Sequence, residues 1–162
     1  MTSAAQFNFN LKVFATTIHV PDDYPTIQEA INAANPGDTI LVEANTYFEH
    51  IVVNKSVSLI GQDPATTVID GNGTGTVVKV TADNVTVSGF TIKNGGSSGH
   101  GIHLYRVSQC NISTNVLSNN KYGIYLEHFA HSPAQNLICK NNLTSNDYGI
   151  VLEGGTNNTV KN

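Results

Sequence analysis

The feature that most constrains this chain is a five-residue pattern, Gly-Ile-x-Leu-x, which recurs in its second half. It stands at Gly101–Tyr105, Gly123–Glu127 and Gly149–Glu153, so successive copies begin 22 and 26 residues apart. Repeats at such a period are typical of solenoids, in which each repeat packs only against its neighbours. Strands this short are not stable alone, but when stacked about 4.8 Å apart each pairs with its counterpart in the next turn. The pattern therefore predicts an all-β stack of short parallel strands.

The alternation of side chains along each copy predicts which residues form the core. The isoleucine and the leucine of a copy fall on one face, which points inward. The residues between them point outward and align from coil to coil, a coil being one turn of the solenoid. The predicted inward residues are Ile102, Leu104, Ile124, Leu126, Ile150 and Leu152.

The outward columns hold the candidate ligand-binding residues. Aromatic rings with polar neighbours suit the packing of sugar rings, but the same columns also suit an aromatic ladder that only stabilises the solenoid. Both interpretations stay open on the sequence alone. The predicted substrate-binding residues are His100, His103, Tyr105, Tyr122, Tyr125, Glu127, Tyr148 and Glu153. No catalytic residue and no metal ligand is predicted.

Polar residues recur in register in the turns. Asn115 and Asn141 align in one column, and Asp70, Asn94 and Asn119 align in another. Stacked amides hydrogen bond along a solenoid, and each such bond contributes on the order of 1 kcal/mol. We therefore expect polar ladders beside the apolar core.

The segment before the strands predicts a helix that closes one end of the core. Thr26–Glu29 forms a capping box, an apolar face runs from Ile27 to Ala34, and Asn35–Asp38 ends the helix. We divide the chain into a leader remnant or disordered tail over 1–16, a cap over 17–38, and a single-stranded right-handed parallel β-helix of about five coils over 39–162.

The C-terminal side shows no comparable cap. The residues Asn158–Asn162 are typical of the start of another strand. Because an unpaired strand edge is a template for pairing, we expect a truncated solenoid that binds further β-helix coils or associates end to end with another copy.

Composition argues against several classes of protein. Charged residues make up 12% of the chain and the net charge is -4, so no basic surface for nucleic acid is expected. No apolar run reaches the roughly 18 residues of a membrane span. Cys110 and Cys139 fall three positions apart in the repeat, one inward and one outward, so we expect free thiols.

Six asparagines stand in Asn-x-Ser/Thr sequons. Such motifs are compatible with glycans on an exported protein, but a chain rich in asparagine and threonine also forms them by chance. The sequence alone favours chance. The six are Asn54, Asn72, Asn84, Asn111, Asn142 and Asn157.

Several motifs resemble a known family. The runs Pro25–Ala34 and Pro36–Val42 resemble the opening of pectin-lyase-like β-helix proteins, as do Thr46–Glu49 and Val68–Gly73. The Gly-Ile-x-Leu columns resemble the repeats of NosD-type periplasmic copper proteins and of archaeal cell-surface proteins. The resemblance covers about residues 17–162. It implies the fold and an extracellular or cell-surface location, while function depends on sites grafted onto the fold.

The catalytic motifs of the related enzymes are missing. Tyr47 and Glu49 match the first motif of pectin methylesterases, but their later aspartates, glutamines and arginine have no matching segment. The stretch Ile69–Gly71 resembles polygalacturonases, whose Asn-Thr-Asp and Asp-Asp motifs are absent. Pectate lyases need calcium-binding acids and a basic arginine, and Arg106 has no acid cluster beside it in sequence.

Glu127 and Glu153 form the best carboxylate pair. By register they stack in neighbouring coils near Tyr105. Two carboxylates about 5–5.5 Å apart suit retaining glycoside hydrolysis. Two solvated surface glutamates are the simpler interpretation.

Two histidine pairs suggest copper. His100 and His103 are three residues apart, which on a strand predicts rings on opposite faces. His128 and His131 lie in the longest insertion, where a turn would bring them together. Copper(I) favours thiolate and thioether ligands, which this chain lacks as a cluster. We therefore expect no cofactor.

The sequence thus predicts a non-catalytic β-helix repeat module of an exported or cell-surface protein, which binds polysaccharide or acts as a structural spacer. One alternative is a carbohydrate-active enzyme, such as a polysaccharide lyase, a glycoside hydrolase or a pectinesterase-like protein. A second alternative is a copper-delivery module. The expected partners are a polysaccharide and further β-helix coils, with no nucleic acid and no membrane span.

Overall fold

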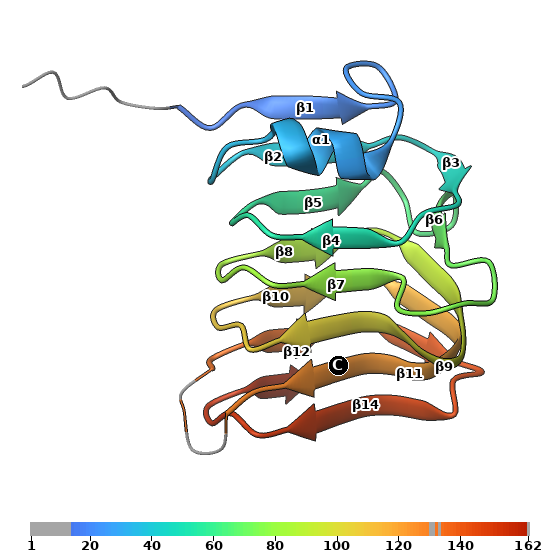
Figure 1. The fold of residues 1–162 in the computed structure, drawn as a ribbon, viewed down its shortest axis with the longest axis vertical. Helices are drawn as coiled ribbons and strands as arrows, with labels where there is room; N and C mark the ends of the chain where they lie inside the picture. The colour runs from blue at the N-terminus through green and yellow to red at the C-terminus, as the bar shows by residue number, and fades with distance from the viewer. Residues whose placement is uncertain (1–13, 130–131, 133, 162) are drawn as a thin grey trace, which may run out of the picture.

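The structure is a computed structural model that describes residues 14–129, 132 and 134–161. This part is an all-β, right-handed parallel β-helix of about six turns with one short helix (Figure 1). The predicted fold class is confirmed, with about one coil more than expected. Most of the predicted tail over 1–16 lies outside the described residues.

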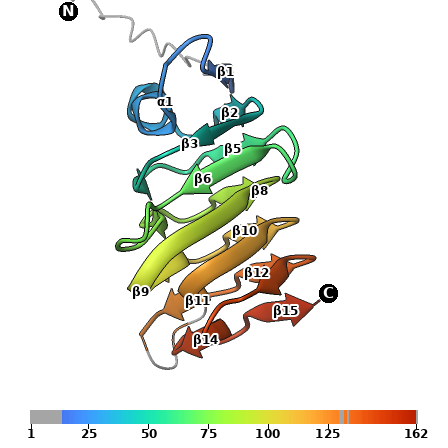
Figure 2. The same ribbon diagram turned by 90° about the vertical axis from the view of Figure 1, so that its right-hand side faces the viewer.

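One parallel sheet, sheet A, runs the length of the solenoid with one strand for each coil. Each strand pairs in register with the next coil, as Ile40 does with Leu59 and Ile112 with Ile138. Figure 2 shows this stacking from β1 to β15. Its strands are β1 (Thr17–Val20), β2 (Thr39–Val42), β5 (Ser58–Gly61), β8 (Thr86–Ser88), β10 (Asn111–Ser113), β12 (Leu137–Cys139) and β15 (Thr159–Lys161).

A second parallel sheet, sheet B, has two arms because its two longest strands bend. The first arm contains β3 (Asn45–Tyr47), β6 (Thr67–Asp70), the start of β9 (Thr91–Tyr105), the start of β11 (Val116–Glu127) and β13 (Asn142–Thr144). The second arm contains β4 (Ile51–Val53), β7 (Val78–Val80), the ends of β9 and β11, and β14 (Tyr148–Glu153).

The core follows the predicted alternation. Ile102, Leu104, Ile124 and Leu126 are fully buried between the sheets. In the last coil the equivalent Leu152 is 43% exposed, because within the described residues β14 pairs only with β11. Burial of apolar surface, at about 25 cal/mol per Å², is the main stabilising term for such a core.

The helix α1 (Ile27–Ala33) closes the N-terminal end of the core, as predicted. Its buried face packs against β1, β2 and β4. Thr26 caps the helix, and the carboxylate of Glu49 accepts two further backbone hydrogen bonds at 3.0 Å, from Ile27 N and Gln28 N. The expectation that the helix comes first is wrong, because β1 precedes it and forms the first strand of sheet A.

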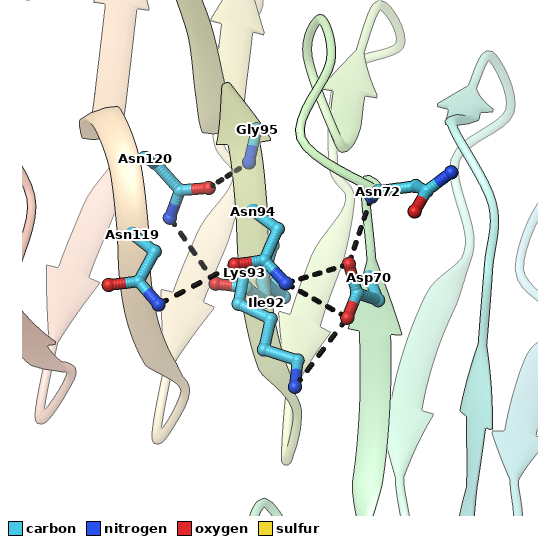
Figure 3. Close-up of polar contacts among 8 residues, drawn as sticks. All are labelled: Asp70, Asn72, Ile92, Lys93, Asn94, Gly95, Asn119 and Asn120. Carbon is cyan, nitrogen blue, oxygen red and sulfur yellow. Dashed lines mark hydrogen bonds and ion pairs between the residues drawn. The ribbon is translucent and has the colours of Figure 1, made fainter. Parts of the chain in front are cut away.

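Polar ladders tie successive coils together, as the aligned turn residues predicted. In Figure 3 the amide of Asn94 donates to both carboxylate oxygens of Asp70 at 2.9 Å, and Asn119 donates to Asn94 at 3.5 Å. Lys93 Nζ lies 3.5 Å from the same carboxylate. Burial acts to raise the pKa of Asp70, but these hydrogen bonds and the Lys93 charge outweigh it and lower the pKa.

A buried ladder also joins Asn115 to Asn141. The Oδ1 atom of Asn141 accepts from both the backbone and the side-chain nitrogen of Asn115, at 3.0 and 3.1 Å. The same pattern links Asn120 to Asn146 and Asn136 to Asn158, two pairs that the sequence analysis missed. In each pair, an asparagine of one coil is stacked on an asparagine of the next coil.

The remaining expectations concern cysteines and membranes. Cys110 is buried and Cys139 is half-buried, and both are free thiols as predicted. Burial raises the pKa of the Cys110 thiol to about 11. Across the described ranges, no helix has the length and apolar character needed to cross a bilayer.

Candidate functional site

The eight predicted site residues all lie on the second arm of sheet B, and contacts between their side chains join them on its outer surface. We call this surface the aromatic face. It follows β9, β11 and β14, whose strands pair in register one coil apart (Figure 1). The registers join His100 to Tyr122 to Tyr148, His103 to Tyr125 to Val151, and Tyr105 to Glu127 to Glu153.

The first column is a continuous stack of rings. His100 lies over Tyr122 with ring centroids 5.2 Å apart and planes 22° apart. Tyr122 lies over Tyr148 at 5.0 Å and 16°. The Nδ1 atom of His100 also lies 2.8 Å from the Thr76 hydroxyl, which fixes the start of the stack. Tyr122 therefore has a ring against each of its two faces.

The second column packs against the first. The ring of Tyr125 lies 4.8 Å from that of His100 and 5.2 Å from those of His103 and Tyr122. The prediction that His100 and His103 point to opposite faces is wrong, since their centroids are 4.7 Å apart. Just before His100 the pairing of β9 with β11 shifts register, so strict alternation does not hold at this corner.

Diagonal contacts connect the column of His103 and Tyr125 to the column of Tyr105, Glu127 and Glu153, each time from one coil to the next. Lys79 Nζ lies 4.7 Å from the centroid of the Tyr105 ring. One coil later, His103 Nε2 lies 3.4 Å from Glu127 Oε2, and in the next coil Tyr125 donates its hydroxyl proton to Glu153. Each carboxylate of the face is thus already next to a partner.

Burial and these neighbours shift the titration of the face. Burial, with the charge of His103 adding to it, lowers the pKa of His100 to about 4. Burial likewise lowers the pKa of His103, although the carboxylate of Glu127 acts in the opposite direction. The hydrogen bond to Glu153, more than burial, raises the pKa of Tyr125 to about 12. The two imidazoles are therefore neutral at pH 7.

Three cations border the face and rest on rings. Arg106 lies over both Tyr105 and Phe129, at 5.0 and 4.5 Å from their centroids. Lys121 lies 5.5 Å from the centroid of Tyr122, and Lys79 lies over Tyr105. Within the described ranges none of the three forms an ion pair with a carboxylate. The sequence analysis did not predict these contacts, because the number of residues between the cation and its ring differs from one contact to the next.

The chemistry open to this arrangement is limited. Glu127 and Glu153 are in register, but one lies beside His103 and the other accepts from Tyr125. The described residues enclose no pocket that would hold a sugar between two carboxylates. His103 Nε2 is buried and, although near Glu127, has no hydrogen bond within the described part of the chain. The side chains of the aromatic face thus mainly contact one another.

Comparisons with known proteins agree with the fold and place the chain in a family. A family model described as periplasmic copper-binding protein (NosD) matches residues 23–162. A cell surface glycoprotein of Methanothermus fervidus is 32% identical over 99 residues, which is 59% of this chain and 16% of that protein. The chain thus spans a small part of that relative.

Solved structures of pectin methylesterases have a similar fold. The chain matches pectin methylesterase PemA from Erwinia chrysanthemi with a TM-score of 0.57 at 14% identity, over 88% of this chain and 56% of that one. A pectin methylesterase in complex with a hexasaccharide gives the same values. At this identity the likeness concerns the fold alone.

The family description names copper, but the described residues do not fit a copper centre. No group of three or more histidine, cysteine, aspartate and glutamate side chains in the described ranges is placed to hold a metal ion. The Cys110 thiol is buried, with its pKa raised by burial, so it is not a ready thiolate. Of the second histidine pair, His131 lies outside the described residues.

The extent of the family match decides the identification. It begins before α1 and runs through every strand from β2 to β15, so it includes the whole aromatic face. Sequence repeats, the parallel solenoid and the match point to one conclusion. This chain belongs to the family described as periplasmic copper-binding proteins (NosD).

Proposed function

We propose that this chain is a rigid, non-catalytic β-helix segment of a cell-surface protein and serves as a structural spacer. The family and the cell surface glycoprotein relative support a location outside the cytoplasm. The observation that favours a spacer is that the outward rings of the aromatic face stack on each other, while Glu153 accepts a hydrogen bond from Tyr125 and Glu127 lies beside His103.

Ring stacking argues against a sugar platform over most of the face. A sugar packs against the open face of an aromatic ring. Tyr122 has one face against His100 and the other against Tyr148, so neither face is free to pack against a sugar ring. Aromatic pairs of this kind each contribute about 0.5–1.5 kcal/mol beyond burial, which suits a ladder that stiffens the solenoid.

The state of the two glutamates argues against hydrolysis. A retaining glycosidase needs one free carboxylate as nucleophile and one protonated carboxyl as acid. Here Glu153 accepts a hydrogen bond from Tyr125, and Glu127 lies next to the imidazole of His103. Glu153 thus already has a hydrogen-bond partner within the face, and Glu127 has a neighbouring imidazole.

Replacement of Tyr122 tests the spacer proposal. Tyr122→Ala removes two stacked pairs, so we expect the free energy of unfolding to fall by about 2 kcal/mol, while Tyr122→Phe leaves it nearly unchanged. Phe48→Ala, at an exposed ring outside the face, is the control. Urea unfolding measures the stability, and a glycan array run on the intact chain should show no specific binding. Unchanged stability of Tyr122→Ala would contradict the proposal.

A second candidate function is the binding of an acidic polysaccharide at the last coil. Tyr148 is 53% exposed, and in the described ranges only the ring of Tyr122 stacks on its ring. Lys121 and Arg106 border the same face without a carboxylate partner. If this function holds, Tyr148→Ala weakens binding to an acidic polysaccharide at least fivefold and Phe48→Ala does not. Equal affinities of both variants would reject it.

A further inference from the structure

The asparagines of this chain fall into two groups that differ in the use of their side chains. The first group forms the ladders between coils and has its amides in hydrogen bonds. None of its members is followed by serine or threonine two residues later. This ladder group is Asn94, Asn115, Asn119, Asn120, Asn136, Asn141, Asn146 and Asn158.

The second group consists of the asparagines in sequons. Across the described part of the chain, none of their side chains forms a hydrogen bond. Asn72, Asn84 and Asn157 occupy turn positions with φ of 50°, 58° and 62°. Asn111 differs from the rest, because it is half-buried in β10 and its Oδ1 atom is enclosed without a partner. The exposed sequon asparagines are Asn54, Asn72, Asn84, Asn142 and Asn157.

A glycan on a ladder asparagine would disrupt the solenoid. The Nδ2 atom of Asn115 donates to Val87 O at 2.9 Å and to Asn141 Oδ1 at 3.1 Å, and the residue is 1% exposed. Attachment of a sugar to Nδ2 removes one of these protons and puts a bulky polar group between coils. In a chain that is exposed to a glycosylating enzyme, the ladder asparagines must therefore lie outside sequons. The eight ladder asparagines do lie outside sequons.

We propose that Asn54, Asn72, Asn84, Asn142 and Asn157 are attachment sites for N-linked glycans, and that Asn111 is not. The proposal rests on the proposed location at the cell surface and names modification sites for it. Asn54, Asn84 and Asn157 lie in the β4–β5, β7–β8 and β14–β15 turns, along one edge of the solenoid (Figure 1).

The modification is a group transfer from a lipid phosphate that carries an oligosaccharide. The Nδ2 atom of the asparagine bonds to the anomeric carbon of the first sugar. The bond from that carbon to the phosphate oxygen breaks, the lipid phosphate leaves with the electron pair, and Nδ2 loses one proton. Nothing is oxidised or reduced. The serine or threonine hydroxyl two residues later marks the acceptor for the transferring enzyme.

The test is to secrete the chain, with a supplied secretion signal, from an archaeal host that carries out N-glycosylation, and to map glycopeptides by mass spectrometry. We expect one glycan at each of the five sites and an unmodified Asn111 peptide. Thr144→Val and Thr159→Val should each remove one glycan, at Asn142 and Asn157. Thr46→Val, an exposed strand threonine outside any sequon, should remove none.

Two results would overturn the proposal. One is a chain without glycans when a reporter sequon in the same cells is modified. The other is equal occupancy at Asn111 and at the five exposed sites. Because the export signal is supplied, the result does not depend on where the protein naturally resides. Localisation of the native protein tests the proposed cell-surface location separately.

Discussion

His100 is the residue whose protonation most affects the aromatic face. It stacks on Tyr122, contacts His103 and Tyr125, and lies near Glu127, Lys79 and Lys121. Burial and His103 lower its pKa from 6.5 to about 4. Between these two values the unfolded chain binds more protons than the folded chain, so acid favours unfolding.

We therefore predict that the free energy of unfolding falls as the pH decreases from about 6.5 to about 4. His100→Phe keeps a ring in the stack and removes the titratable group, so its stability should depend less on pH in this range. His103, whose pKa is also lowered, contributes to the remaining slope. Urea unfolding at several pH values measures both proteins. Identical slopes would show that His100 does not titrate as described.

At the residue scale, the sequence predicted which residues align from coil to coil better than it predicted which side chains touch. The Gly-Ile-x-Leu spacing placed Tyr125 beside His103 and Glu153 beside Glu127 in the correct registers. It did not predict the contact of His100 with His103, because alternation assumes a regular strand and His100 lies at a corner. Nor did it predict the link from Tyr125 to Glu153, since coil lengths vary and diagonal neighbours have no fixed spacing.

At the scale of the elements, the polar ladder that begins at Asp70 joins three coils. Asp70 is 7% exposed and accepts from the Asn94 side chain and from Asn72 N (Figure 3). Its charge strengthens these hydrogen bonds, since bonds to charged groups contribute roughly 1.5–3 kcal/mol. The carboxylate therefore anchors the ladder that continues to Asn119.

We predict that Asp70→Asn lowers the free energy of unfolding at pH 7 by about 1 kcal/mol, and that Asp70→Ala lowers it by about 3 kcal/mol. The amide keeps one acceptor for Asn94, whereas alanine leaves the half-buried side-chain amide of Asn94 without its acceptor. Because the pKa of Asp70 is lowered from 3.8, its contribution is present above pH 3.8 and is lost as the pH falls through the folded pKa. Equal losses in both variants would contradict this role.

The N-terminal cap shows why a motif can be recognised while its role is not. Tyr47 and Glu49 match a motif of pectin methylesterases, but here Glu49 caps α1 through Ile27 N and Gln28 N. The hydroxyl of Tyr47 donates to Glu43 O at 3.1 Å. Ile27 and Gln28 precede Glu49 by more than twenty residues, so no local sequence pattern could predict this contact. The capping box at Thr26, a local signal, was predicted correctly.

For the whole molecule, stability should decrease from the cap toward the last coil. Ile102 and Leu104 lie in strands paired on both sides, whereas β14 pairs only with β11 in the described structure. We predict that the amides of Ile150–Leu152 exchange with solvent about tenfold faster than those of Ile102–Leu104 in a dilute solution of the 162-residue chain. Hydrogen exchange with mass spectrometry measures this ratio.

Concentration provides the control for that prediction. If copies associate end to end, protection of Ile150–Leu152 rises with protein concentration and sedimentation shows larger species. A monomer at all concentrations whose last coil is as well protected as Ile102–Leu104 would contradict both the gradient and the association.

The measurement that tests the central claim most directly is an activity screen of the intact chain. Pectin, polygalacturonate and common plant and bacterial glycans serve as substrates, and reducing ends and unsaturated products are the readouts. A structural aromatic face predicts no product above the blank from the wild type, Glu127→Gln or Glu153→Gln. Product that disappears in Glu127→Gln but persists in Glu43→Gln, a glutamate outside the face, would show that the face is a catalytic site.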